Sequence, residues 1–507
     1  MKRWGVPDCF ALVIAFCLVP MTHAQTPAAT QAPAPSTLPA PAFASLLPHQ
    51  KLLREIYQEL IEINTTDSAG SCTQAARAMA ARLKTGGYSD ADMQIIIPPD
   101  GPKKGNLVAR LKGTAGAAVA TRRPLLLLAH IDVVEARRED WERDPFKLVE
   151  EGGYFYARGS SDDKAMAAIF VTNMIRYKKE RLAATAATAA TATNTLPARD
   201  IILALTCDEE LVPTRFNGVQ YLLKHHRNLI DAEIALNEGG GGAMDKSGKP
   251  ILHGIQAGEK TFQSFQLEVT NVGGHSSTPN KNNAITRLAE GLTRLGKFDF
   301  PFRLSDITRS YFERRAALEP PATAADMRAI LKEPPDPAAQ ARLLGGNALY
   351  NATVRTTCVV TTIEGGHAIN ALPQRARAVV NCRILPGEKV AEVEATLIKV
   401  LADPDIKITH IGTATEAPSP PLTPELLKAV EDITAEMWPG VPVIPALLAG
   451  ATDGRFLNGV GIWTYGISGA FFPPEGSRAH GLNEKFAVKS LYEAHEFLWR
   501  LGKKLTS

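Results

Sequence analysis

The sequence predicts an α/β protein with a mostly parallel sheet, interrupted by a smaller α+β domain. The chain has 507 residues, too many for one hydrophobic core. Apolar runs of strand length alternate with helical segments up to about residue 256 and again after about residue 413. Between these limits the strands alternate apolar and polar residues, as half-exposed strands do.

The first 44 residues are typical of a secretory signal followed by a tether. A positively charged start precedes an apolar stretch, residues 9–19, and a small-x-small cleavage site that ends at Ala24. We therefore expect residues 1–24 to be a signal peptide that is removed. The mature protein would lie outside the cytoplasm without a membrane anchor, in the periplasm if the source is a Gram-negative bacterium. The alternative is an uncleaved anchor. Residues 25–44 are rich in Ala and Pro, which predicts a disordered linker.

The α/β pattern begins at residues 45–256. The helices are expected at residues 52–63, 72–84 (with Ser71 as N-cap), 165–179 and 217–230. The strands are expected at residues 106–113, 124–134, 200–207 and 232–237, as near-continuous apolar runs that indicate central, usually parallel strands. A low-complexity stretch, residues 182–197, is predicted to be a surface loop.

The pattern of residues 257–413 predicts a ferredoxin-like α+β domain inserted into the first one. Its strands and helices follow in the order β-α-β-β-α-β, at residues 261–272, 284–295, 352–364, 375–385, 390–402 and 406–412. Residues 298–346, rich in Pro and Ala, interrupt it as a helical insertion. The α/β domain then resumes at residues 414–507 and ends in a helix over 490–505.

Charge and cysteine content exclude some classes of protein. The formal net charge is +3 without a basic stripe, so we expect no nucleic-acid partner. Four cysteines follow the signal and none forms a CxxC pair, which excludes a disulfide scaffold. Cys358 and Cys382 face each other if their strands form a hairpin. A disulfide and two buried free thiols both fit this placement.

Histidines and carboxylates end the apolar strands of the α/β domain. The residues are His130, Glu209, Glu210 and Glu238, joined by Asp162 after a flexible Gly-Ser-Ser and by His480 beyond the insertion. Each alone has an ordinary explanation: a polar pair, an acidic turn or a helix cap. Charge at the end of an apolar strand is costly, however, unless it is paired or ligated. These ligand types suit zinc or a similar divalent ion, and an extra carboxylate can serve as general base. The sequence therefore predicts a two-metal hydrolase site.

With these motifs in this order, the chain resembles the dinuclear zinc exopeptidase and amidohydrolase family. That family includes glutamate carboxypeptidase, aminoacylase, carnosinase and succinyl-diaminopimelate desuccinylase. The segment NEGGGG and the long insertion are most similar to carboxypeptidase S and to secreted N-acyl-amino-acid hydrolases. The resemblance covers about residues 50–505. It implies a zinc-exopeptidase catalytic domain and an inserted domain that acts as lid and dimerisation domain, so that a homodimer through the lid is one expectation.

The resemblance also implies a role for each motif residue. Asp162 would bridge two Zn²⁺ ions, for which Co²⁺ or Mn²⁺ could substitute. His130 and Glu238 would complete one ion's shell, and Glu210 and His480 the other's. Glu209 would be the general base, and Asp132, two residues after His130, would orient that imidazole. One departure is Ala165, which stands where the family usually has Gly.

Substrate contacts are expected from the inserted domain. By the resemblance, His275 in GGHSS would stabilise the oxyanion, often in a partner subunit's site, although a turn histidine is the simpler interpretation. Asn370 matches a substrate-binding Asn-x-x-Pro element. Arg383 matches the arginine that binds the substrate carboxylate, a geometry that a guanidinium suits, but an arginine at a strand edge fits equally. Asp453 and Arg455 match a family element whose role the sequence leaves open.

The predicted activity is hydrolysis of an amide bond next to a free carboxylate, in short peptides or N-acyl amino acids. Water activated by the ions would attack, with Glu209 as general base. Dipeptidase or aminopeptidase specificity is the enzymatic alternative. A non-catalytic extracytoplasmic peptide-binding protein is the alternative from another class, and the intact set of acid and histidine residues argues against it.

Overall fold

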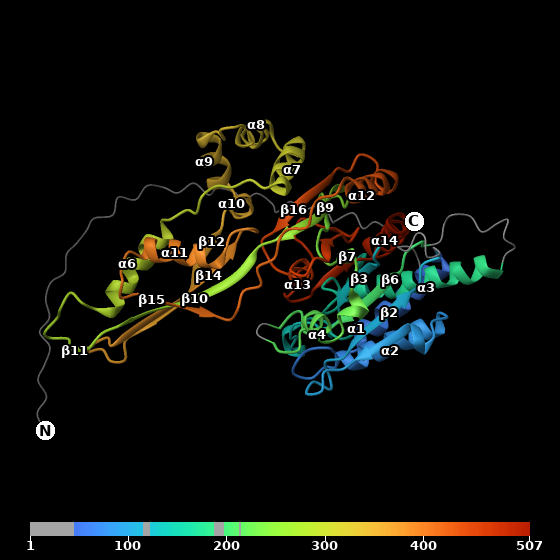
Figure 1. The fold of residues 1–507 in the computed structure, drawn as a ribbon, viewed down its shortest axis with the longest axis horizontal. Coiled ribbons are helices and arrows are strands. Elements are labelled where there is room, and N and C mark those ends of the chain that lie inside the picture. The colour runs from blue at the N-terminus through green and yellow to red at the C-terminus, as the bar shows by residue number, and fades with distance from the viewer. Residues whose placement is uncertain (1–44, 115–121, 187–196, 212–213) are drawn as a thin grey trace, which may run out of the picture. The chain divides into compact units, whose positions relative to one another are not determined.

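The fold is described from a computed structural model, which covers residues 45–114, 122–186, 197–211 and 214–507 (Figure 1). The expected signal peptide (1–24), linker (25–44) and most of the low-complexity stretch (182–197) lie outside the described residues. Within the described ranges, no helix combines the length and the hydropathy that a membrane span requires.

A mixed ten-stranded sheet forms the α/β part. Its strands, in spatial order, are β1 (Met93–Ile96), β2 (Asn106–Leu111), β6 (Ile201–Thr206), β3 (Leu125–His130), β7 (Ile234–Asn237), β17 (Trp463–Gly466), β9 (Pro250–Glu259), β8 (Gly242–Met244) and β18 (Phe471–Phe472), while β16 (Val443–Leu448) pairs with β9. Strands β6, β3, β7 and β17 are parallel, as was predicted for β6, β3 and β7. Because β17 follows the inserted segment, residues on both sides of it build one sheet.

The direction of β2 was predicted wrongly. The run 106–113 was expected among the parallel strands, but β2 is antiparallel to both of its neighbours, β1 and β6. Its apolar run reflects burial of nearly every residue, and burial on both faces does not determine strand direction.

Two layers of helices explain why the central strands are apolar throughout. In β3, Leu125 and Leu127 belong to one core cluster, and Leu126 and Leu128 to another, because alternate residues point to opposite faces. The first face carries α1 (Pro48–Glu62), α2 (Cys72–Thr85), α3 (Lys164–Ala186), α12 (Pro424–Met437) and α14 (Val488–Thr506); the second carries α4 (Gly218–His225), α5 (Arg227–Ile230) and α13 (Gly454–Asn458). Ser71 caps α2 as predicted. The expected helix 217–230 is divided at His226, whose φ of −143° is not helical.

A separate four-stranded antiparallel sheet follows β9. Its order is β12 (Thr357–Gly365), β14 (Arg375–Ile384), β10 (Thr261–Thr270) and β15 (Lys407–Ile411), the ferredoxin-like order that the sequence predicted. Helices α6 (Ala284–Gly296) and α11 (Val390–Leu401) share its core. Only Lys260 separates β9 from β10, and its buried Nζ donates to the carbonyls of Ala352 and Arg355.

The predicted helical insertion contains α7 (Asp306–Arg315), α8 (Pro321–Ile330) and α9 (Pro337–Gly346), and α10 (Ala348–Val354) follows it. These helices share a small core of their own around Phe312 and Met327. Because α10 occupies residues expected in a strand, β12 begins only at Thr357. Two small sheets complete the fold: β4 (Val149–Glu151), β5 (Tyr154–Tyr156) and β19 (Lys485–Ala487) in one, and β11 (Gly274–His275) and β13 (Ala371–Leu372) in the other.

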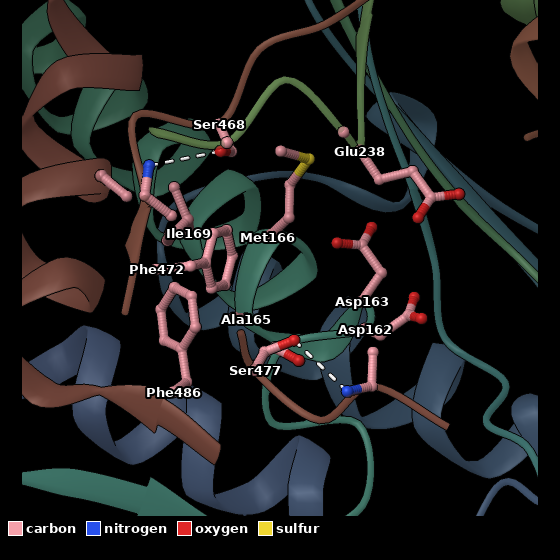
Figure 2. A pocket seen from close by; sticks show the side chains of 16 residues that line it. Asp162, Asp163, Ala165, Met166, Ile169, Glu238, Ser468, Phe472, Ser477 and Phe486 are labelled. Carbon is pink, nitrogen blue, oxygen red and sulfur yellow. Dashed lines mark hydrogen bonds between the residues drawn. The ribbon is translucent and has the colours of Figure 1, made fainter. Parts of the chain in front are cut away.

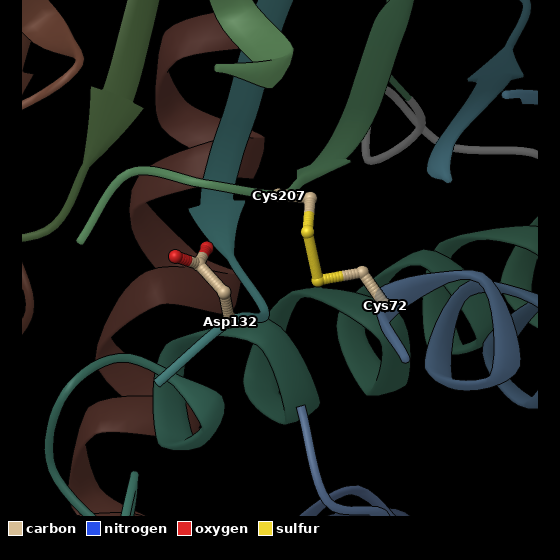
Figure 3. A group of neighbouring side chains, drawn as sticks. All are labelled: Cys72, Asp132 and Cys207. Carbon is tan, nitrogen blue, oxygen red and sulfur yellow. A yellow bond between two sulfur atoms is a disulfide. The ribbon is translucent and has the colours of Figure 1, made fainter. Parts of the chain in front are cut away.

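All four described cysteines form disulfides. Cys358 and Cys382 occupy facing positions on β12 and β14, which decides between the two alternatives that the sequence left open. Cys72, the first residue of α2, is bonded to Cys207, the residue after β6 (Figure 3). No pattern in the sequence indicated this second bond, which joins residues 135 positions apart.

Candidate active site

The candidate site lies where the parallel strands end. His130 is the last residue of β3, Glu209 and Glu210 follow β6, and Glu238 follows β7. Since neighbouring parallel strands end at the same sheet edge, side chains distant in sequence meet there. The structure thus brings together the acid and histidine residues that were predicted to form one site.

Asp162 stands between the two histidines. One carboxylate oxygen lies 3.1 Å from Nε2 of His130, and the other lies 3.1 Å from Nε2 of His480. Glu210 reaches the same His480 nitrogen at 2.9 Å. His480 adopts a left-handed backbone conformation with a φ of 62°, which is rare outside glycine and recurs at functional sites. The peptide bond between Asp162 and Asp163 is cis.

A second group shares His130 with the first. The ligand atoms of His130, Glu209 and Glu238 all lie within 4.8 Å of one another, as do those of His130, Asp162 and Glu210. Nε2 of His130 is 3.9 Å from the Glu238 carboxylate. Two clusters of metal-ligand type are therefore adjacent and have one residue, His130, in common.

Asp132 supports both the histidine and the glutamates. Its buried carboxylate accepts hydrogen bonds from the backbone N–H groups of Glu209 and Glu210, at 3.2 and 3.1 Å. Its own carbonyl oxygen lies 3.1 Å from Nδ1 of His130. Such a contact fixes the tautomer that presents Nε2 to the cluster.

Glu484 holds the segment that carries Asp162. This carboxylate is fully buried and lies four positions after His480. It accepts hydrogen bonds from the Arg158 guanidinium, from the Ser161 hydroxyl and from backbone N–H groups, at 2.8–3.1 Å. The backbone donors are Gly159, Ser161 and Asp162. One side chain thereby connects the segment of Asp162 to that of His480.

The carboxylates of the site favour positive charge on the two histidines. Burial opposes protonation of His130, yet hydrogen bonds to Asp132 and Asp162 raise its pKa well above the ordinary value. Hydrogen bonds to Asp162 and Glu210 raise the pKa of His480 to about 10. Although burial opposes ionisation of Asp162, the two imidazoles hold its pKa well below the usual range.

Glu209 and Glu238 lie close to other carboxylates, so this part of the site carries an excess of negative charge. Burial, and then the Asp453 carboxylate, raise the pKa of Glu209 well above its ordinary value. Burial also raises the pKa of Glu238, and Glu209 adds to that effect. Carboxylates so close together are costly unless cations compensate them, and imidazole and carboxylate donors suit zinc. The residues present therefore fit a pair of divalent ions.

The residues that were predicted to bind the substrate lie in two separate places. Nδ1 of His275 accepts from the backbone N–H of Ser277, and its neighbour Ser276 donates to the carbonyl of Asn370. His275 and Asn370 thus share one exposed turn beside β11 and β13. Among the described residues, none of the hydrogen bonds or ion pairs of His275 reaches the acid–histidine cluster.

Arg383 lies near Arg455. The Arg383 guanidinium stacks on Phe262, 4.7 Å from the ring centre, and burial together with the charge of Arg455 lowers its pKa. Asp453, two residues before Arg455, accepts a hydrogen bond from Asn217 at 2.6 Å. Arg383 is half-buried and on an inner position of its sheet, so it is not an arginine of a free strand edge.

Several supporting residues were not predicted. They are Glu484, Asn217, and the Cys72–Cys207 disulfide beside Asp132 (Figure 3). The only signal for Glu484 was its place in HGLNE, directly after the last predicted ligand, where it resembles a solvent-exposed loop residue.

The family model for peptidase family M20/M25/M40 matches residues 126–504. The chain belongs to this family. Its relatives include human N-fatty-acyl-amino acid synthase/hydrolase PM20D1, 29% identical over 75% of this chain and 73% of that protein. Another is the probable carboxypeptidase S-like 2 of Dictyostelium discoideum, 28% identical over 75% of this chain and 71% of that one. The M20 family metallo-carboxypeptidase Sso-CP2 of Sulfolobus solfataricus has a similar fold, with a TM-score of 0.63, 19% identity, and coverage of 89% of this chain and 98% of that one.

Membership of the M20 family confirms the predicted resemblance, the α/β fold class and the enzyme class. The chain is a hydrolase of the metallopeptidase and amidohydrolase type. The family includes dinuclear metal-binding peptidases, with which the two adjacent ligand groups agree.

Proposed function

We propose that this M20 enzyme is a zinc-dependent hydrolase that cleaves an amide bond next to a free carboxylate, in N-acyl amino acids or short peptides. The observation that carries the proposal is the position of Asp162 between His130 and His480, with Glu210 and Glu238 completing two ligand groups. These residues would hold two divalent ions. Imidazole and carboxylate donors favour zinc, and Co²⁺ or Mn²⁺ suit the same donors.

The residues of the chain have separate tasks in this reaction. When bound, the ions polarise the amide carbonyl and lower the pKa of a water molecule. Glu209 takes the proton from the attacking water and passes it to the leaving amine. Asp132 holds the backbone of Glu209 and the imidazole of His130, so that base and ligand keep their relative positions.

The substrate carboxylate is assigned to the paired guanidiniums of Arg383 and Arg455. Burial and the nearby charge of Arg455 lower the pKa of Arg383, and a bound carboxylate would compensate both positive charges. His275 and Asn370, in their shared turn, are assigned to the oxyanion and to the substrate backbone. These roles require residues 257–413 to act as a lid over the site, with residues 45–256 and 414–507 as the catalytic domain. A homodimer through the lid would supply His275 from a partner.

We further propose that residues 1–24 are a cleaved signal and that the mature enzyme is periplasmic. The N-terminal pattern supports export, and the two disulfides agree with an oxidising compartment.

One substrate screen tests the specificity. The zinc-loaded mature chain is assayed on N-acyl amino acids, on dipeptides and on matched substrates with an amidated C-terminus. We expect cleavage of the free acids and loss of at least about a hundredfold in kcat/KM on amidation, because the half-buried guanidiniums would lack their partner. Equal rates on blocked and free substrates, or activity that a chelator does not affect, would contradict the proposal.

A substitution of the general base tests the mechanism. Glu209→Gln should lower kcat by about 10²–10⁴-fold, the contribution typical of a general base. Metal analysis should still find two ions per chain, because Glu209 is assigned to neither shell. Glu142→Gln, which changes an exposed carboxylate, is the control. A Glu209→Gln enzyme of normal kcat would refute the assignment.

A further inference from the structure

A pocket opens beside the acid–histidine cluster and leads into the protein (Figure 2). Its volume is about 160 Å³. Asp162, Asp163 and Glu238 line one side of it, whereas Phe472 and Phe486 lie on the opposite side (Figure 2). The pocket therefore begins at the proposed metal ligands and ends among aromatic rings.

The deep part of the pocket is apolar. Met166 and Ile169 project into it from α3, Phe486 from β19 and Ala494 from α14, and all four are buried. These walls belong to the packed core, so they hold their positions without a ligand. An aliphatic group that enters the pocket leaves water without displacing a polar partner.

The charges around the pocket decide which part of a substrate it can take. Among the described residues, every charged side chain that lines the pocket is a carboxylate, and none of the lining residues is a lysine, arginine or histidine. A substrate carboxylate would find no positively charged partner among these lining residues. The paired guanidiniums of Arg383 and Arg455 offer it one elsewhere. The pocket is therefore suited to the end of the substrate that carries no charge.

We infer that this pocket binds the aliphatic acyl group of an N-acyl amino acid, on the carbonyl side of the scissile bond. The inference rests on the proposed function and narrows its substrate class from amides in general to those with an apolar acyl chain. A cavity of about 150 Å³ lined by aliphatic and aromatic side chains is large enough for benzene. A pocket of about 160 Å³ therefore has room for roughly six carbon atoms.

The test is a series of N-acyl derivatives of one amino acid, from acetyl to dodecanoyl. For the wild-type enzyme, kcat/KM should rise about fourfold for each methylene that enters the pocket and level off after roughly six carbons. Ala494→Leu, which fills the pocket, should lower the ratio of kcat/KM for the hexanoyl and acetyl substrates at least about tenfold. Phe472→Ala, which enlarges it, should move the plateau to longer chains.

The control is Ala81→Leu, the same change at an exposed position of α2. It should leave the hexanoyl-to-acetyl ratio at the wild-type value. The inference is overturned if the wild type cleaves the acetyl substrate but gains nothing from longer chains, or if both pocket variants keep the wild-type ratio. A zinc-loaded wild type that cleaves neither N-acyl amino acids nor peptides would instead sink the proposed function itself. The opposite shifts of the two variants cannot arise from misfolding.

Discussion

Glu484 shows how much of the candidate site depends on a residue that faces no substrate. Its carboxylate accepts the backbone N–H groups of Gly159, Ser161 and Asp162, and it is paired with the buried guanidinium of Arg158. Buried polar groups without partners are costly, so removal of this one acceptor leaves several donors unsatisfied at once. The segment that positions Asp162 would then lose its support.

Glu484→Ala should therefore lower both metal affinity and stability. We expect metal affinity to fall about 10–100-fold, as for other residues that support a ligand, and the free energy of unfolding to fall by about 3–5 kcal/mol. Competition with a chromogenic chelator and urea unfolding measure the two effects. Glu475→Ala, which removes the partly exposed partner of Lys485 in the same loop, is the control and should change neither quantity by more than about 1 kcal/mol. Normal metal affinity in Glu484→Ala would show that the loop holds its position without the carboxylate.

Glu259 gives a prediction about pH. Burial raises its pKa from 4.5 to about 7, and one of its carboxylate oxygens has no hydrogen-bond partner in the part of the chain that the structure describes. The unfolded chain releases this proton near pH 4.5, whereas the folded protein retains it up to about pH 7. The stability that comes from this group is thus fully present below about pH 4.5 and is lost as the pH rises through about 7.

Glu259→Gln removes the titrating group and should flatten this dependence. Relative to the variant, the wild type should lose up to about 3 kcal/mol of unfolding free energy between about pH 4.5 and pH 8. Urea unfolding at several pH values measures the difference between the two proteins. A difference that is independent of pH would mean that Glu259 titrates normally in the folded state.

Single residues were predictable where their position was chemically unfavourable. His130, Glu210 and Glu238 lie at or just beyond the ends of apolar strands, where a charged group needs a partner, so their convergence could be expected from the pattern. Glu484 could not be found in this way. Its burial results from packing between two loops, and no periodicity in the sequence reports such packing.

A disulfide bond connects two of the secondary-structure elements next to the candidate site. The Cys72–Cys207 disulfide joins the start of α2 to the end of β6, two residues before Glu209. The Cys358–Cys382 disulfide instead crosses neighbouring strands of the smaller sheet. Only the first bond adjoins the segment that carries the proposed base and a proposed ligand.

Replacement of each disulfide-bonded cysteine pair by serine should lower the stability of both proteins but the activity of only one. We expect the Cys72→Ser/Cys207→Ser protein to lose about 2–5 kcal/mol of unfolding free energy, the usual cost of a native disulfide, and several-fold in kcat/KM. The Cys358→Ser/Cys382→Ser protein is the matched control, and it should lose stability but keep kcat/KM. Activity assays at a temperature well below the unfolding temperatures of both proteins give the two values of kcat/KM. Equal losses of kcat/KM in the two proteins would contradict a local effect at β6.

Strand positions could be predicted more fully than strand directions. The runs that became β3, β6 and β7 were recognised from their uninterrupted apolar character, which follows from helices on both faces. The run that became β2 looks the same, yet it is antiparallel. Direction depends on how the chain returns to the sheet, and hydropathy contains no information about that path.

For the molecule as a whole, metal binding and folding should be coupled. Residues from both sides of the inserted segment meet in the cluster, since Asp162 and Glu210 contact His480. This long-range convergence was expected from the sequence, because the α/β pattern resumes after the inserted domain and His480 lies in the resumed part. Ions that bind the assembled cluster stabilise the folded state alone.

Removal of the metal should therefore lower the unfolding temperature. At a free zinc concentration about a hundred times the Kd, binding contributes about 2.7 kcal/mol, which corresponds to several degrees in Tm. Thermal unfolding with zinc and with a chelator measures the shift. Glu209→Gln should keep the shift, and Asp162→Asn should lose most of it. A Tm that is the same with zinc and with chelator would mean that the ions do not hold the chain together.

The Cys72–Cys207 disulfide beside the candidate site also determines how active protein must be prepared. With the disulfide formed, the sulfur atoms of Cys72 and Cys207 and an Asp132 carboxylate oxygen lie within 4.8 Å of one another (Figure 3), and reduction of the bond would leave two thiols and a carboxylate, a set of zinc-ligand type. Thiolates bind zinc readily, so zinc added to reduced protein would be captured at this place and would block closure of the crosslink. Oxidative refolding in the presence of a chelator, with zinc restored only afterwards, avoids that trap.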